Sequence, residues 1–208
     1  MTTKTSRKLE QAAAKVTEAD ASVTDGFREH REGWPMRLLG AVSDAGDQPQ
    51  LRVISGVTFA AGLLTRDPRL IRAGVRMLLA HELATAAKNF VKRRVDRTRP
   101  RSAGGRKQAS PRPGRHQSKE MTSFPSGHTA GSVAVARAFA RELPDHRTAA
   151  LAAAGFVALA QIPRCAHYPS DVGAGAIIGA GAEALLAQVW PAETETIPST
   201  RPQPLPLA

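Results

Sequence analysis

The segment that most restricts the fold runs from residue 172 to residue 190, where the only charged side chain is Glu183. As a helix it would cover about 30 Å, close to the hydrocarbon thickness of a bilayer. Such a segment must either cross a membrane or lie buried inside a helical protein, and the pattern leaves both open. Two other apolar stretches, 51–64 and 148–162, are short for membrane crossings.

The rest of the chain indicates helices rather than sheets, because alanine is abundant and alternating runs of β-branched residues are scarce. We predict an all-α protein, a membrane-embedded bundle of about five to six helices. The expected organisation is a polar arm over 1–33, the bundle domain over 34–190, and a disordered proline-rich tail over 191–208. The stretches 40–50 and 101–120, which contain glycine and proline, are predicted to be loops.

Positive charge is concentrated in one segment. The chain has 29 Lys and Arg against 18 Asp and Glu, a net charge of +11, and the stretch 92–119 contains eleven of the basic residues with one acid, Asp96. A phosphate group, a polyanion or an anionic lipid surface is the expected neighbour. On charge alone, a solvated loop or a nucleic-acid-binding tail remains an alternative. The single cysteine, Cys165, excludes an internal disulfide and a cysteine-cluster metal site.

Three short segments together contain the parts of a phosphate site. In the first, Lys92 is expected at the end of a helix and Arg99 just beyond it, followed by Pro100. Arginine offers a planar fork of donors and lysine a point charge, and both suit a phosphate dianion.

The second segment, Pro125-Ser126-Gly127-His128, is typical of a helix start, whose free N–H groups bind oxyanions. His128 would then lie in the first turn, where it can supply a proton. In the third segment His167 and Asp171 are four residues apart. A carboxylate at this spacing can hold one imidazole nitrogen so that the other faces a substrate.

In this order and spacing, the three segments resemble the type 2 phosphatidic acid phosphatase superfamily, which also contains the vanadium haloperoxidases. Its pattern is Lys-x6-Arg-Pro, Pro-Ser-Gly-His and Ser-Arg-x5-His-x3-Asp, and the match spans 92–171. The resemblance, closest to the membrane-associated lipid phosphatase branch, implies an all-helical bundle. It also implies these roles: phosphate binding by Lys92, Arg99, Ser126 and Gly127, general acid catalysis by His128, and nucleophilic attack by His167 oriented by Asp171.

The third segment departs from the family pattern, because Ala160-Gln161 stands where the pattern has Ser-Arg. Gln161 carries no charge, and losing a charge-assisted bond to a dianion costs about 1.5–3 kcal/mol. Arg164, three residues on, either turns inward as a substitute phosphate ligand or points to solvent, and both options remain open.

The expected function is hydrolysis of a lipid phosphomonoester or diphosphate through a phosphohistidine, with no metal and no cofactor. The expected partners are a lipid-phosphate substrate and the inner or plasma membrane, crossed several times, and no nucleic acid. The alternatives are a vanadate-dependent haloperoxidase or a basic protein that binds nucleic acid or an anionic surface. The positive-inside rule would place 92–119 on the cytoplasmic side, whereas membrane members of the family usually place the site outside the cytoplasm.

Overall fold

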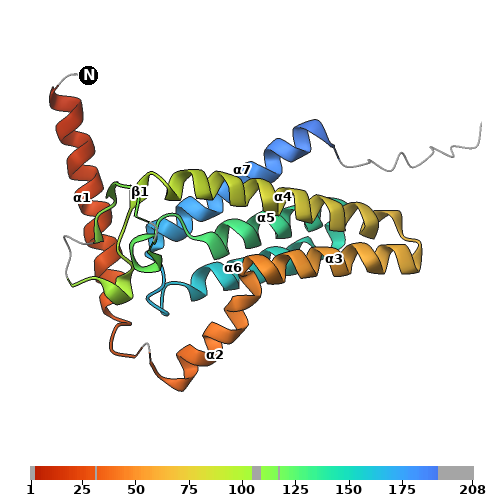
Figure 1. Cartoon of the computed structure of the whole chain (residues 1–208), viewed down its shortest axis with the longest axis horizontal. Helices are drawn as coiled ribbons and strands as arrows, with labels where there is room; N and C mark the ends of the chain where they lie inside the picture. Colours follow the sequence, from red (N-terminus) through yellow and green to blue (C-terminus); the bar gives the residue numbers. More distant parts are fainter. Residues whose placement is uncertain (1–2, 31, 105–108, 117, 192–208) are drawn as a thin grey trace, which may run out of the picture.

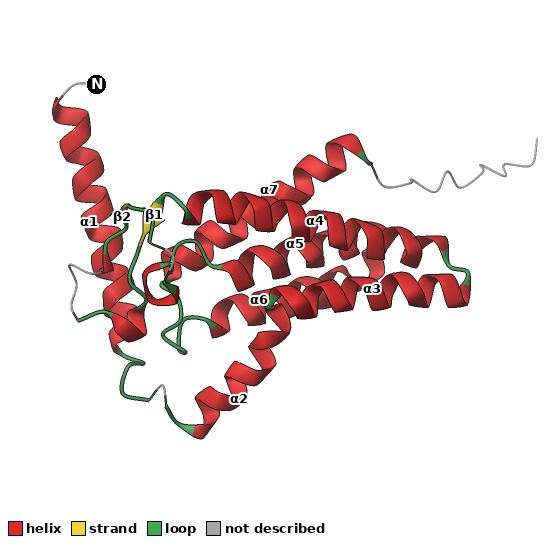
Figure 2. Ribbon diagram, viewed as in Figure 1, coloured by secondary structure: helices red, strands yellow, loops and turns green. Residues whose placement is uncertain are grey.

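A computed structural model describes residues 3–30, 32–104, 109–116 and 118–191. These residues form an all-α fold, as predicted, with two very short antiparallel strands, β1 (Val95–Asp96) and β2 (Arg112–Pro113). Figures 1 and 2 show the helices, which are α1 (Thr3–Asp25), α2 (Trp34–Ser43), α3 (Gln48–Thr65), α4 (Pro68–Lys92), α5 (Gly127–Glu142), α6 (Arg147–Ala160) and α7 (Pro169–Val189).

The described residues thus contain seven α-helices, one more than the upper expected number, and the additional helix is α2. The predicted loop over 40–50 is wrong for most of its length. Residues 40–43 end α2, a short 3-10 helix, η1 (Asp44–Gly46), follows, and α3 begins at Gln48. Pro49, which indicated a loop, lies in the first turn of α3, where its missing N–H has no intrahelical partner to lose.

Helix α5 lies in the middle of the bundle and packs against α4, α6 and α7. Close packing of α5 against α7 depends on two glycines. A Cβ atom on Gly179 would lie 2.3 Å from the Ala130 carbonyl oxygen, and one on Gly175 would lie 2.6 Å from that of Ser126. The core is rich in alanine for the same reason, since small side chains let helix backbones approach closely. Its buried alanines are Ala73, Ala80, Ala84, Ala134, Ala138 and Ala182.

Four helix ends meet at one end of the bundle, the left end in Figure 1. Helices α4 and α6 end there, and α5 and α7 begin there. The backbone N–H of Ser126 donates to the Asp171 carbonyl oxygen at 3.0 Å, which joins the starts of α5 and α7. The two connections at this end, 93–126 and 161–168, contain half of the predicted site residues, and the other half lie in the adjoining ends of α4, α5 and α7.

Helix α1 crosses this same end of the bundle (Figure 1) and contacts α7 and the short 3-10 helix η2 (Pro100–Ser102). Its last turns are attached rather than free, because Asp20, Ala21 and Thr24 are buried. The predicted division of the chain at residue 34 stays a prediction. Of the predicted disordered tail, residues 192–208 lie outside the described part of the chain.

Among the described helices, only α7 is both long enough and apolar enough to cross a membrane. Only 28% of its most apolar stretch is buried, so α7 is not the enclosed core helix that its sequence also allowed. Ile177 is 75% exposed and Val189 is 81% exposed. The predicted multiple crossings stay a prediction.

Candidate active site

His167 lies between a carboxylate and a guanidinium. Its Nδ1 atom is 3.6 Å from Asp171 Oδ2, and its Nε2 atom is 3.5 Å from Arg99 Nη1. The His167 side chain is only 1% exposed. Burial, together with the positive charge of Arg99, lowers the pKa of His167 to about 4. The ring is therefore neutral at physiological pH and keeps a free lone pair on one nitrogen.

Asp171 is held by three donors as well as by its neighbouring histidine. Its Oδ2 accepts hydrogen bonds from Ser123 Oγ at 2.5 Å and from the Tyr168 backbone N–H at 2.9 Å, and its Oδ1 accepts from Arg97 Nη1 at 2.6 Å. The contact with Tyr168 is the usual cap of a helix start, with an acid in the first turn. These bonds fix the carboxylate so that it can orient the imidazole.

Arg97 connects this carboxylate to the N-terminal helix. Its Nη2 donates to Asp20 Oδ2 at 2.7 Å, and its guanidinium lies 4.1 Å from the centre of the Tyr168 ring. Asp20 also accepts hydrogen bonds from the backbone N–H of Ser170, at 3.0 Å, and from its hydroxyl. The arginine is 1% exposed and the Asp20 carboxylate 4%. Asp20, Arg97 and Asp171 thus form a buried chain of charges that ends at His167.

The two buried charges that support Asp171 were not predicted from the sequence. Arg97 occupies one of the six unspecified positions of the first motif, and Asp20 lies far away in the predicted polar arm. Ser123 precedes the second motif without belonging to it. The sequence alone does not distinguish these buried polar side chains from the many exposed ones, and only the fold does.

The two predicted phosphate-binding cations lie beside His167 and are satisfied by carbonyl oxygens. Arg99 donates to the carbonyl oxygens of Lys119 at 2.7 Å and Ala166 at 3.2 Å, and Lys92 Nζ donates to that of Thr122 at 2.7 Å. Burial and the positive charge of Arg99 lower the pKa of Lys92 to about 7. Burial and the positive charge of Arg101 lower the pKa of Arg99 to about 10. Carbonyl oxygens are neutral, so they do not compensate the positive charges of Arg99 and Lys92. A bound anion would compensate them.

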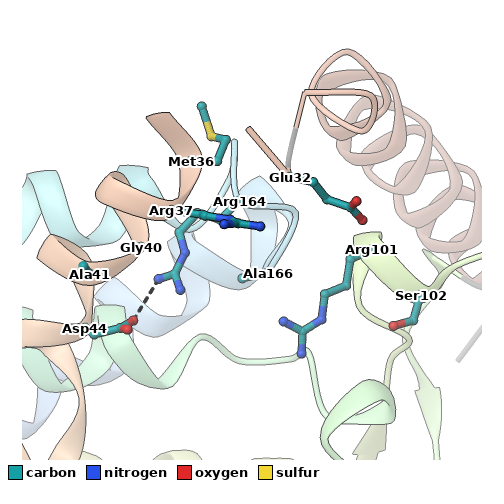
Figure 3. Close-up of a pocket in the computed structure, with 10 residues that line it drawn as sticks. All are labelled: Glu32, Met36, Arg37, Gly40, Ala41, Asp44, Arg101, Ser102, Arg164 and Ala166. Atoms are coloured by element: carbon teal, nitrogen blue, oxygen red, sulfur yellow. Dashed lines mark hydrogen bonds and ion pairs between the residues drawn. The ribbon is translucent and has the colours of Figure 1, made fainter. Parts of the chain in front are cut away.

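Gln161 is fully buried, and its amide donates to the Val157 carbonyl oxygen at 3.0 Å within its own helix. The Arg164 side chain is partly buried and paired. It donates to Ser43 Oγ at 2.5 Å and Asp44 Oδ1 at 3.1 Å, and so lies against α2 and η1 (Figure 3). Its direct contact with the phosphate stays a prediction.

Ser126 and Gly127 form the start of α5. The Ser126 hydroxyl caps the helix by accepting from the Thr129 hydroxyl at 3.0 Å and from its N–H at 3.4 Å. A Cβ on Gly127 would lie 3.3 Å from Lys88 Cε. Lys88, one turn before Lys92 and largely buried, is therefore a third lysine or arginine at the site, which the motifs did not indicate.

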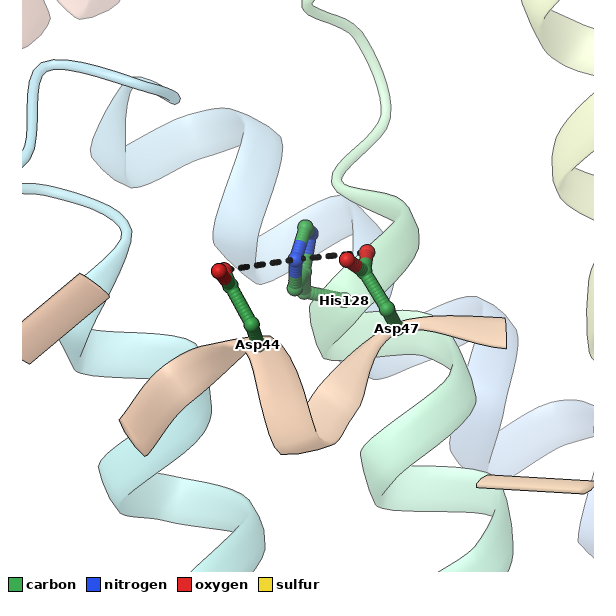
Figure 4. Close-up of side chains that lie close together, drawn as sticks. All are labelled: Asp44, Asp47 and His128. Atoms are coloured by element: carbon green, nitrogen blue, oxygen red, sulfur yellow. Dashed lines mark ion pairs between the residues drawn. The ribbon is translucent and has the colours of Figure 1, made fainter. Parts of the chain in front are cut away.

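His128 projects from the first turn of α5 toward two carboxylates of η1 and its C-cap (Figure 4). Its Nε2 atom lies 2.8 Å from Asp47 Oδ1 and 4.0 Å from Asp44 Oδ1. Burial and the charges of Arg164 and Arg99 lower the pKa of His128, against the opposing effect of the two carboxylates. These three ligand-bearing side chains lie within 4.8 Å of one another, so by donor type and spacing they could hold a metal ion. Asp44 and Asp47 were not predicted.

A family model described as the PAP2 superfamily matches residues 73–195, more than half of the chain. The chain belongs to the PAP2 superfamily. All three motif segments lie inside the matched range, so the resemblance drawn from the sequence is confirmed. Membership of the PAP2 superfamily also accounts for the convergence of the ends of α4, α5, α6 and α7 on one site.

Two curated PAP2 relatives share a shorter stretch with this chain. A lipid A 1-phosphatase of Rhizobium johnstonii is 43% identical over 68 residues, which are 33% of this chain and 28% of the relative. A lipid A 1-phosphatase of Rhizobium etli is 41% identical over 68 residues, 33% of this chain and 29% of the relative. The aligned stretch thus spans less than a third of the length of these relatives.

One solved structure shares the PAP2 fold over most of the chain. It is the crystal structure described as the first transmembrane PAP2 type phosphatidylglycerolphosphate phosphatase, from Bacillus subtilis. The TM-score is 0.61 at 20% sequence identity, and the match covers 84% of this chain and 86% of the other. At this identity the likeness is one of fold.

Proposed function

We propose that this protein is a membrane phosphatase that hydrolyses a phosphomonoester or diphosphate of a lipid through a phosphohistidine intermediate. The observation that carries the proposal is the position of His167, with Asp171 at Nδ1 and Arg99 at Nε2. The carboxylate favours the tautomer with its proton on Nδ1, so the lone pair is on Nε2, beside the cation that would hold a phosphate oxygen.

In the first step, Nε2 of His167 attacks phosphorus as the phosphate lies against Arg99 and Lys92. A nitrogen–phosphorus bond forms, the bond from phosphorus to the leaving oxygen breaks, and that oxygen takes a proton from His128. The fixed positive charges stabilise the equatorial oxygens in the transition state, and this is the main source of acceleration.

In the second step, water attacks the phosphohistidine and gives a proton to His128. The nitrogen–phosphorus bond breaks, inorganic phosphate leaves, and both histidines return to their starting states. Asp47 beside Nε2 of His128 stabilises the protonated ring. A bound phosphate dianion opposes the lowering of the His128 pKa in the same way, so the general acid gains its proton as substrate binds.

Two features support a membrane location. Only 28% of the most apolar stretch of α7 is buried, and exposed apolar side chains cover the outer sides of α3, α4 and α6. Apolar surface of this extent is unfavourable in water and suits a hydrocarbon environment. The most exposed of them are Val53, Val57, Leu64, Phe90, Leu159, Ile177 and Val189.

The test is phosphate release from phosphatidate by detergent-extracted protein, in the presence and absence of EDTA and of vanadate. We expect activity that EDTA leaves unchanged, that vanadate inhibits, and that His167→Asn or His128→Asn abolishes. Acid-labile, base-stable labelling of the wild type by a ³²P-labelled substrate would report the phosphohistidine.

Full activity of the His167→Asn protein would overturn the nucleophile assignment. Salt-sensitive retention of DNA without any phosphate release would instead favour the nucleic-acid-binding alternative. Oxidation of halide by peroxide in the vanadate-loaded protein, again without phosphate release, would favour the haloperoxidase alternative.

A further inference from the structure

A hollow of about 660 Å³ lies beside the catalytic centre, between α2, η1, η2 and the connection 161–168. Three arginines line it, Arg37 from α2, Arg101 from η2 and Arg164 from the connection. Figure 3 shows Arg101 reaching it from the side opposite to Arg37 and Arg164. Its size lies within the range typical of small-molecule sites.

The hollow adjoins the predicted phosphate site on two sides. Ala166 lines the hollow, and its carbonyl oxygen accepts a hydrogen bond from Arg99 Nη1 at 3.2 Å. Asp44 also lines it, and its Oδ1 atom lies 4.0 Å from His128 Nε2. A phosphate held by Arg99, with its leaving group near His128, would therefore direct the rest of the head group toward this hollow.

The charges that line the hollow favour an anion. The three arginines face two carboxylates, Glu32 and Asp44. Arg164 is paired with Asp44 at 3.1 Å, and Arg101 lies 3.9 Å from Glu120. Within the described part of the chain, Arg37 has no ion-pair partner, and its side chain is exposed. Guanidinium groups bind phosphate and carboxylate oxygens through paired N–H donors.

We propose that Arg37, Arg101 and Arg164 form a subsite for a second anionic group on the head group of the substrate. This inference rests on the proposed function and narrows its substrate class. The substrate is a lipid whose polar head group has a phosphodiester or carboxylate besides the phosphate that is removed. A plain phosphatidate, which lacks a second charged group, would leave the subsite empty.

The experiment compares two lipids in the same mixed micelles. Phosphatidylglycerolphosphate has a phosphodiester as well as a terminal phosphomonoester, and phosphatidate has the phosphomonoester alone. We expect a higher kcat/KM for the first lipid in the wild-type protein. Arg37→Ala and Arg101→Ala each lower the ratio of the two kcat/KM values by about tenfold, the effect of losing one charge-assisted bond.

Arg115→Ala is the matched control, since Arg115 is an exposed arginine of the basic segment that does not line the hollow. It removes the same charge and should leave the ratio unchanged. Thermal unfolding of each variant in detergent checks that it folds. If Arg101→Ala does not fold, Arg37→Ala provides the test, because Arg37 is exposed.

Equal kcat/KM for the two lipids in the wild type would overturn the subsite, as would an equal loss for both lipids in the arginine variants. Either result leaves the proposed phosphatase function standing. Failure of the wild type to release phosphate from both lipids would overturn the proposed function instead. Binding to vesicles containing either lipid by the His167→Asn protein then tests the subsite by itself, and equal binding to both would overturn it.

Discussion

At the scale of single residues, the reactivity proposed for His167 depends on its surroundings. An exposed imidazole is half protonated near pH 6.5, but here burial and Arg99 lower the pKa to about 4. The same cause acts on Lys92, whose pKa is lowered to about 7. His167 must be deprotonated to attack phosphorus, and Lys92 must stay protonated to bind the phosphate. The two pKa values therefore define the pH range in which the enzyme is active.

We predict a bell-shaped dependence of kcat/KM on pH. Activity rises as pH increases through about 4, because His167 loses its proton and becomes nucleophilic. Activity falls again by about pH 7, because Lys92 loses its charge. The lowered pKa of His128, which must donate a proton, acts in the same direction. Initial rates at low substrate concentration across pH 3–9 check this. A maximum at alkaline pH would contradict it.

The second prediction at this scale concerns Asp20, a positioning residue that acts on His167 through Arg97 and Asp171. Asp20→Asn keeps the shape but removes the charge, so Arg97 loses one of its two carboxylates. We expect kcat to fall about tenfold with a smaller change in KM, and the unfolding free energy to fall by about 3 kcal/mol. Steady-state kinetics and thermal unfolding measure the two effects.

Glu10→Gln is the control for that substitution, because Glu10 is an exposed acid on the same helix. It should change neither quantity. Loss of stability in Asp20→Asn with an unchanged kcat would show that Asp20 is structural only. Asp20→Glu, which restores the charge, should recover part of kcat.

At the scale of helices, the site depends on how closely α7 approaches α5. Gly179→Ala would place a Cβ 2.3 Å from the Ala130 carbonyl oxygen, so the two helices must separate. We expect a loss of about 1–3 kcal/mol in unfolding free energy and reduced activity, since the starts of both helices contribute to the site. Gly181→Ala is the matched control, because nothing lies within 4 Å of its Cβ position. There alanine should stabilise the helix by up to about 1 kcal/mol.

Thermal unfolding in detergent and phosphate release measure both glycine variants. If Gly179→Ala and Gly181→Ala change stability and activity equally, close contact between Gly179 and α5 is not the reason for the effect. Helix α1 also supports the site, because its buried Asp20 accepts hydrogen bonds from Arg97 and from the backbone N–H of Ser170.

At the scale of the whole molecule, the exposed apolar surface predicts that the protein lies in a membrane. Ile177 is 75% exposed on α7, and a lysine near the middle of a crossing helix costs about 2.5–3.5 kcal/mol. Ile177→Lys should therefore reduce the fraction of protein that stays in carbonate-washed membranes, and Ile177→Leu should not. Release of the wild-type protein by carbonate alone would contradict a membrane-spanning location.

Much of the fold was predictable from sequence, because helix periodicity and helix starts are local. The helices from α3 to α7 and the all-α class were predicted in this way. Helix α2 was missed because its Pro35 and Gly40 also suit a loop, whereas its packing against α6 and η1 stabilises it as a helix. The end of α4 was predicted at Lys92, which is its last residue, and the Asp67 side chain caps its start.

The sequence by itself determined which chemistry is available, because the residues of the three motifs have the types and spacings of a phosphate site. Tertiary structure alone decided which other charges act on them. Asp47 reaches His128, Asp20 reaches Arg97, and Arg164 turns to Asp44. These partners are far apart in the chain or follow no fixed spacing, so they meet only once the helices have packed. Burial, which strengthens the contact between Asp20 and Arg97, also exists only in the packed structure.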